Sequence, residues 1–139
     1  MSEIRIFKRK IYDRMLQWKQ ERDGKTALLV KGARRVGKST IVEEFARQEY
    51  ETYMLIDFSR ASEEVKSLFN DLMDLDYIFL RLQAIYNVIL QERRSVIIFD
   101  EVHKCPLATQ AIKQLVKDNR YHYIETVSLI SSRKNTEDI

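Results

Sequence analysis

The sequence predicts an α/β fold of three layers, in which helices cover both faces of a parallel sheet of about four strands. Short apolar segments suited to strands alternate with longer segments whose apolar residues recur at helical spacing. This alternation implies parallel pairing with right-handed crossovers. The segment at residues 96–99 is apolar throughout, which favours a strand buried on both faces of the sheet.

The first half of the chain holds four of the expected elements. A helix is expected over residues 4–22, after which an Asp-Gly pair interrupts the apolar spacing. A short strand at residues 26–30 stops near Gly32, a second helix begins near Lys38, and a second strand covers residues 53–58. The residues that predict the buried faces of the two helices are Ile11, Met15 and Trp18 in the first and Ile41, Val42 and Phe45 in the second.

The second half of the chain holds the remaining elements. Ser62 suits the N-cap of a short helix, and a longer amphipathic helix is expected over residues 75–90. A third strand at residues 95–99 precedes a helix over residues 106–118, which starts with proline, and a last strand covers residues 123–130. The apolar faces of the two long helices are Ile78, Leu82, Ile85 and Ile89 in the first and Ala108, Ile112 and Leu115 in the second.

The composition of the 139 residues excludes several classes of protein. A hydrophobic fraction of 45% argues against a disordered chain. No apolar run approaches the roughly 18 residues needed to span a bilayer, and the first residues lack the apolar segment of a secretory signal. Cys105 is the single cysteine, so it cannot form an internal disulfide. We therefore expect a cytoplasmic protein without a membrane partner.

Charge is distributed unevenly, although the net charge is only +3. Residues 1–25 contain eight Lys and Arg against four Asp and Glu, whereas residues 51–101 contain five against ten. A basic helix suits contact with nucleic acid, but a solvated helix face is the simpler interpretation and no other feature supports nucleic acid. We expect residues 1–24 to form a basic helix with its lead-in, and residues 25–139 to form the core.

Residues 32–40 carry the strongest chemical signal. Gly32 to Ser39 fit the pattern G-x-x-x-x-G-K-[ST], and Thr40 follows it. The pattern comes after an expected strand and leads into an expected helix. Glycine lets the backbone wrap closely around phosphates, and the amides at the start of a helix favour an anion. Lys38 would reach the β- and γ-phosphates, and the hydroxyl of Ser39 would bind Mg²⁺. The residues expected to bind the nucleotide are Gly32, Ala33, Arg34, Arg35, Val36, Gly37, Lys38, Ser39 and Thr40.

Two acidic residues at the end of the third strand form a second signal. Asp100 and Glu101 follow four apolar residues, at the strand end where open α/β sheets bind their ligands. Asp100 would hold Mg²⁺, directly or through water, and Glu101 would polarise the attacking water as a general base. The Asn-Lys-x-Asp segment that reads guanine in small GTPases is absent from the sequence, which favours ATP over GTP.

Hydroxyls on the fourth strand form a weaker signal. Ser128 is a candidate sensor of the γ-phosphate, because a parallel fourth strand would end beside the third. A hydroxyl at a strand end also commonly bonds nearby backbone, and the sequence alone supports both interpretations. His103 and Cys105 lack the spacing of zinc ligands, and we interpret them as polar surface.

Three segments, at residues 32–40, 97–102 and 124–131, together resemble the AAA-type ATP-binding proteins of bacteria and archaea. The resemblance is collinear from about Phe7 onward. It implies a P-loop NTPase sheet with the strand order 5-1-4-3-2, and it implies ATP and Mg²⁺ as ligands. It also implies Walker A roles for Lys38 and Ser39, Walker B roles for Asp100 and Glu101, and a sensor 1 role for Ser128, with Glu101, Lys38 and Ser128 acting in catalysis.

The sequence departs from this family in two places. Val127 stands where the family commonly has glycine, between Thr126 and Ser128. The chain also ends soon after the fourth strand, so we expect an incomplete core that lacks the fifth strand and the arginine finger. Hydrolysis of ATP is therefore expected to be weak or absent.

The expected function is that of an ATP-binding protein with a Mg²⁺-dependent ATPase core of the AAA type. One alternative is a nucleotide-binding or interaction module without turnover. Another is a P-loop kinase that transfers phosphate to a small molecule. The expected partners are ATP and either a second copy of the chain or a C-terminal segment.

Overall fold

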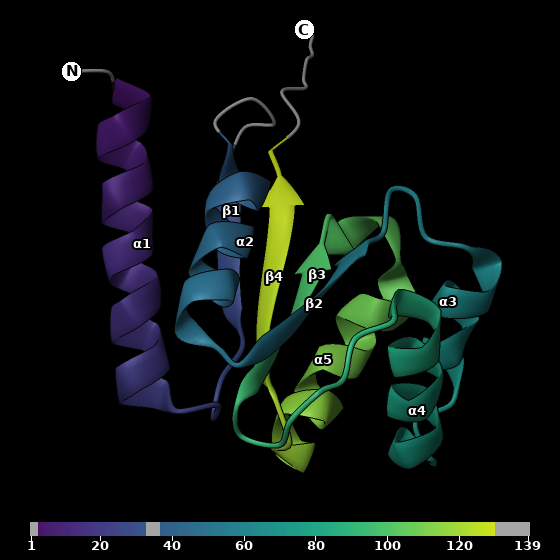
Figure 1. Ribbon diagram of the computed structural model, residues 1–139. Helices are drawn as coiled ribbons and strands as arrows, with labels where there is room; N and C mark the ends of the chain where they lie inside the picture. The colour runs from purple at the N-terminus through teal and green to yellow at the C-terminus, as the bar shows by residue number, and fades with distance from the viewer. Residues whose placement is uncertain (1–2, 33–36, 130–139) are drawn as a thin grey trace, which may run out of the picture.

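The computed structural model describes residues 3–32 and 37–129, in which helices and strands follow one another in the predicted order (Figure 1). Strands β1 to β4 alternate with the helices α1 to α5 and with two short 3₁₀ helices, η2 and η3. The elements are α1 (Glu3–Arg22), β1 (Leu28–Gly32), α2 (Lys38–Glu49), β2 (Thr52–Asp57), α3 (Glu63–Ser67), η2 (Leu68–Asn70), α4 (Leu75–Tyr86), β3 (Ser95–Asp100), η3 (Val102–Lys104), α5 (Pro106–Asp118) and β4 (His122–Ser128).

All four strands pair in parallel and lie in the order β1-β4-β3-β2, which confirms the order expected for strands one to four. Gly32 at the end of β1 pairs with Ser128, and Asp57 at the end of β2 pairs with Asp100. The carboxyl ends of the strands therefore lie at one edge of the sheet (Figure 1). Among the described residues, no strand pairs with the other side of β1, where the family order places a fifth strand.

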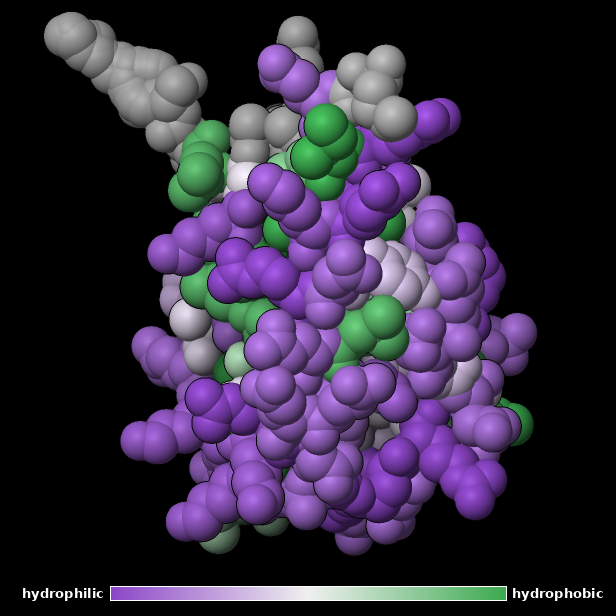
Figure 2. All heavy atoms as spheres, turned by 90° about the vertical axis from the view of Figure 1, so that its left-hand side faces the viewer, coloured by the Kyte–Doolittle hydropathy of each residue, from purple (hydrophilic) through white to green (hydrophobic). Residues whose placement is uncertain are grey.

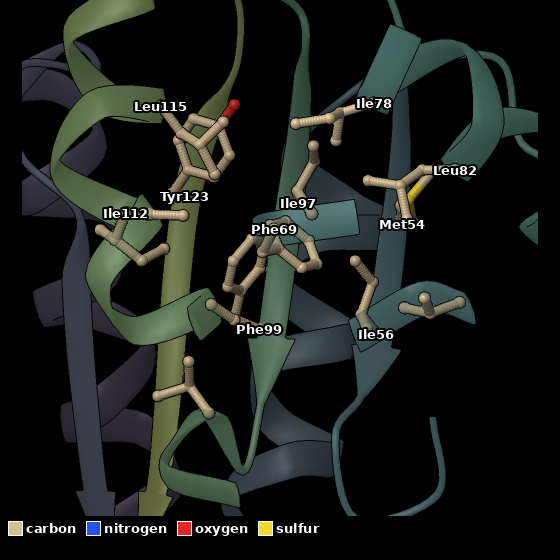
Figure 3. Close-up of a cluster of buried hydrophobic side chains, with 14 of the residues drawn as sticks. Met54, Ile56, Phe69, Ile78, Leu82, Ile97, Phe99, Ile112, Leu115 and Tyr123 are labelled. Carbon is tan, nitrogen blue, oxygen red and sulfur yellow. The ribbon is translucent and has the colours of Figure 1, made fainter. Parts of the chain in front are cut away.

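Alternate side chains of the central strand β3 enter two separate cores, because successive side chains of a strand point to opposite faces. Val96 and Ile98 pack in the core that α1 and α2 cover. Ile97 and Phe99 pack in the core that α3, α4 and α5 cover. Figure 3 shows Phe99 beside Phe69 in the middle of this second core, between side chains of α4 and α5. All six residues of β3 are buried, as the apolar run predicted.

Helix α1 packs against α2 and keeps a polar outer face. Met15 and Trp18 are buried, as predicted from their spacing, whereas Ile11 is only partly buried. The hydroxyl oxygen of Tyr12 lies 2.6 Å from Oε1 of Gln48 and 2.9 Å from Oε2 of Glu49, and its single proton is shared between these two acceptors. Figure 2 views the molecule from the side of α1 and shows that this face is mostly hydrophilic. Within the described residues, no helix is both long enough and apolar enough to cross a membrane.

The helix predicted over residues 75–90 is shorter in the structure, because α4 ends at Tyr86. Asn87 caps it in a left-handed conformation with φ of 55°, which asparagine tolerates better than most residues. Beyond this cap the helical spacing no longer applies. The prediction that Ile89 is buried is therefore wrong, since 75% of its surface is exposed and Leu90 is buried instead. Ile85 lies inside α4, in its last turn, and the prediction that it is buried is also wrong, because 37% of its surface is exposed.

Three smaller predictions also need correction. β1 begins at Leu28, two residues later than expected, and β4 begins one residue earlier, at His122. β4 ends at Ser128, so the predicted strand is wrong at Leu129, whereas residue 130 lies outside the described residues. Cys105 is not polar surface, because it is buried in the core under α5, whereas His103 is partly exposed.

His122 is buried at the amino-terminal end of β4, at the opposite edge of the sheet from the carboxyl ends of the strands. Its Nδ1 lies 2.6 Å from the hydroxyl of Tyr50, with which it shares a hydrogen bond. Burial lowers the pKa of His122 below the ordinary value of 6.5, and the charges of Arg93 and Lys19 lower this pKa further, whereas Asp23 opposes them. The folded protein therefore holds this imidazole neutral to a lower pH than the unfolded chain does.

We expect the free energy of unfolding to fall as the pH drops below about 6.5, by at most about 1.4 kcal/mol per pH unit from His122. The sign follows from linkage, because the unfolded chain binds the proton more tightly and acid therefore favours unfolding. Urea unfolding at pH 7.5 and 5.5 measures this loss. A His122→Phe variant should show a smaller loss, while the control His103→Gln should behave like the wild type. An equal loss in all three proteins would contradict this assignment.

Candidate functional site

The carboxyl-terminal edge of the sheet meets the first turn of α2. Gly37 precedes this helix with φ of 78°, a left-handed conformation that favours glycine. A side chain at this position would also come within 3.2 Å of Cε of Lys8, on α1. Lys38 and Ser39 are the first two residues of α2. Both therefore start at a helix N-terminus, where the peptide dipoles favour a bound anion.

Lys38 is a buried charge, with only 2% of its surface exposed. Its Nζ donates to Oγ of Ser128 at 2.8 Å and to Oε2 of Glu101 at 3.2 Å. A buried ammonium group needs such partners, because a charge that is buried without a partner strongly destabilises the fold. Three elements of the fold thus meet at one charged cluster: the start of α2, the end of β3 and the end of β4.

Glu101 is held by Ser128 as well as by Lys38. The Ser128 hydroxyl donates to Oε2 at 2.6 Å, and the Ser128 N–H donates to Oε1 at 3.1 Å. Burial alone would raise the pKa of Glu101, but the hydrogen bonds from Ser128 and Lys38, together with the charge of Lys38, outweigh burial and lower this pKa below its ordinary value. Glu101 is therefore a carboxylate at neutral pH.

Asp100 forms a second group of hydrogen bonds beside the first. Its Oδ1 accepts the hydroxyl of Ser39 at 2.8 Å and the hydroxyl of Thr126 at 2.6 Å. The same Thr126 oxygen accepts the backbone N–H of Glu101 at 2.9 Å. Asp100 is therefore oriented from two sides, by the first turn of α2 and by the neighbouring strand β4.

The backbone turns sharply at Glu101, which has φ of 54° and ψ of 49°. A left-handed conformation is uncommon for a residue with a long side chain, and it persists only where the surrounding structure supports it. Here the amide of Glu101 bonds Thr126, and its carboxylate bonds Lys38 and Ser128. The strain therefore falls on a residue whose side chain is aimed into the charged cluster.

Comparison with known proteins identifies the family of this chain. Residues 24–138 match a family model described as an AAA domain. The chain belongs to this AAA family. The predicted resemblance to AAA-type P-loop ATPases is thereby confirmed, and the chain is a nucleotide-binding module of the ATPase type.

Among solved structures, the AAA domain is similar to PCH-2 of C. elegans. The two share 13% sequence identity with a TM-score of 0.47, over 91% of this chain and 35% of the PCH-2 chain. The chain thus spans about a third of the length of that protein. No curated protein matches the sequence.

The structure brings together five of the residues predicted for the site of this AAA domain. They come from α2, from the end of β3 with the residue that follows it, and from β4, and they are Lys38, Ser39, Asp100, Glu101 and Ser128. The Ser128 hydroxyl bonds the side chains of Lys38 and Glu101, and not merely nearby backbone. Gly32 ends β1 and Gly37 directly precedes α2, while Thr40 is exposed on α2. The predicted ligands Ala33, Arg34, Arg35 and Val36 lie outside the described residues.

Sequence reasoning missed the hydrogen bonds of Thr126 and the position of the Lys8 side chain beside Gly37. Thr126 lies two residues before Ser128 on β4, so both side chains share a face of the sheet, and this period of two was the available signal. No sequence signal linked Lys8 to Gly37, because their proximity depends on how α1 packs against the core.

Proposed function

We propose that this AAA domain binds ATP together with Mg²⁺ and hydrolyses it slowly. The observation that carries the proposal is the meeting of Lys38, Glu101 and Ser128 beside the N-terminus of α2. A buried lysine, an ionised carboxylate and a hydroxyl at a helix start suit a polyphosphate and the water that attacks it.

Lys38 and the first turn of α2 would bind the phosphates. In the structure, the charge of Lys38 is compensated by Glu101. A bound polyphosphate would compete for the same ammonium group, since its oxygens are also anionic acceptors. Binding of ATP would therefore weaken the bond between Lys38 and Glu101 and release the carboxylate toward the γ-phosphate.

The residues present also fit Mg²⁺, which takes oxygen ligands and keeps several water molecules. The hydroxyl of Ser39 and the carboxylate of Asp100 lie within 2.8 Å of each other. No group of three or more His, Cys, Asp and Glu side chains that could hold a metal occurs in the described residues. The other ligands would thus be phosphate and water oxygens, and the bound ion would offset the charge of the phosphates.

Glu101 would act as the general base. Hydrogen bonds from Ser128 and Lys38 lower its pKa, so it is ionised at neutral pH. Release from Lys38 would raise this pKa and make the carboxylate a better acceptor of a proton from water. The expected rate is low, because Oε2 accepts from both Lys38 and Ser128 and these bonds must rearrange first. The same bonds support the second candidate, a module that binds nucleotide without turnover.

Thermal unfolding with and without Mg-ATP tests the proposed binding. Ligand that binds only the folded state adds about 2.7 kcal/mol at a 100-fold excess over Kd, so the unfolding temperature of the wild type should rise by several degrees. A Lys38→Ala variant should lose this rise, whereas Lys66→Ala, which alters an exposed ion pair on α3, should keep it. An unchanged unfolding temperature of the wild type at saturating Mg-ATP would contradict the proposal.

A further inference from the structure

We propose that Thr126 is a positioning residue that orients Asp100 for Mg²⁺ and so couples the metal to nucleotide binding. The inference rests on the proposed function and adds to it a residue with a separate role. Thr126 is fully buried. Its hydroxyl lies 2.6 Å from Oδ1 of Asp100 and 2.9 Å from the backbone nitrogen of Glu101.

The hydrogen bond that Thr126 accepts determines the direction of the hydrogen bond that it donates. A hydroxyl has one proton, and the N–H of Glu101 can only donate, so the Thr126 oxygen accepts from Glu101 and directs its proton to Asp100. The bond to Asp100 is charge-assisted and therefore strong. Asp100 is thus held toward Ser39, the other proposed ligand of Mg²⁺, by a group on a different strand.

Thr126 also supports the turn that follows β3. The left-handed conformation of Glu101 aims its N–H at the Thr126 oxygen, inside the sheet. Without this oxygen, the amide would be buried with no acceptor, and the turn would lose a bond that offsets its strain. Asp100 precedes this turn directly, so its carboxylate would also lose a fixed position.

This geometry predicts a selective effect of losing the hydroxyl. In the structure Thr126 bonds Asp100 and Glu101, whereas the proposed phosphate contacts come from Lys38 and the first turn of α2. Nucleotide should therefore bind the Thr126→Val variant in the absence of Mg²⁺ about as well as it binds the wild type. Only the additional affinity that Mg²⁺ provides should be lost.

The experiment measures the Kd of N-methylanthraniloyl-ADP by fluorescence, in EDTA and in Mg²⁺. The readout is the Kd in EDTA divided by the Kd in Mg²⁺, so a larger ratio means that Mg²⁺ strengthens binding more. This measurement needs no turnover. We expect Thr126→Val to lower the ratio by roughly tenfold or more, the usual effect of removing a group that supports a metal ligand. Thr126→Ser keeps a hydroxyl and should keep the ratio. Thr52→Val, which removes a strand hydroxyl at the opposite end of the sheet, is the matched control.

Each result supports or overturns the role of Thr126. A normal ratio in Thr126→Val would overturn it. Loss of probe binding in EDTA as well would also overturn it, because the hydroxyl would then support the whole fold or the phosphate site. A lowered ratio in Thr126→Ser or in Thr52→Val would show that the effect is not specific. If the wild type binds no probe in either condition, the proposed function itself is wrong and the role of Thr126 is wrong with it.

Discussion

Replacement of Glu101 by glutamine is expected to reduce ATP hydrolysis by roughly 100- to 10,000-fold and to tighten ATP binding at the same time. The first effect follows because an amide cannot accept a proton from the attacking water. The second follows because the carboxylate that now competes for Nζ of Lys38 is removed, which leaves this ammonium group to the phosphates. Phosphate release and binding of a fluorescent ATP analogue measure the two effects separately.

Glu125→Gln is the matched control for this variant. Glu125 lies on β4, three residues before Ser128, and burial raises the pKa of its carboxyl group. Its removal should leave hydrolysis within about twofold of the wild type, as for most changes away from the reacting groups. Unchanged turnover in Glu101→Gln would exclude a general-base role. Weaker ATP binding in that variant would contradict the competition between Glu101 and nucleotide. Tight binding without phosphate release in the wild type would favour the module without turnover.

Replacement of Phe99 by alanine is expected to lower the free energy of unfolding by about 3–5 kcal/mol. The Phe99 ring is fully buried at the centre of the sheet. Its centroid lies 5.4 Å from each of the rings of Phe58 and Phe69 and 6.0 Å from that of Tyr123, all in edge-to-face contact. The variant loses apolar contacts on three sides and leaves a cavity, because η2, β4 and the residue that follows β2 cannot all close over the gap.

Urea unfolding measures this loss, and the control variant is Tyr77→Ala, which removes an exposed aromatic side chain on α4. Tyr77→Ala should cost less than about 1 kcal/mol, because half of the Tyr77 surface is already in water. If Phe99→Ala does not fold, Phe99→Leu offers a smaller loss of the same kind, of roughly 1–2 kcal/mol. A cost for Phe99→Ala similar to that for Tyr77→Ala would show that this ring does not hold the second core together.

The elements whose starts are encoded locally were predictable from the sequence. The Ser62 hydroxyl accepts the N–H of Val65 as an N-cap does, and Pro106 begins α5 as expected. The meeting of the glycine-rich motif and the acidic pair was predictable as well. Parallel pairing brings the ends of β1, β3 and β4 to one edge, so residues 37–39 and 100–101 must converge there.

Features that depend on contacts between distant parts of the chain were not predictable. The end of α4 is determined by the left-handed turn at Asn87, which competes with apolar spacing that continues to Ile89. The bond between Lys38 and Glu101 joins residues 63 positions apart. Sequence motifs place these two groups near each other, but their hydrogen bonds depend on side-chain geometry that only the packed structure shows.

The burial of all six residues of β3 has a consequence for the kinetics of the molecule. β3 is bonded on both sides, to β2 and β4, so its amides become accessible to solvent only when most of the sheet opens. Asp100 is the last residue of this strand, and Glu101 follows it directly. The two acidic groups of the site are thus attached to the end of a strand that is paired on both sides. Local opening of the outer helices would then leave the backbone that carries both carboxylates in place, because β3 stays paired with β2 and β4.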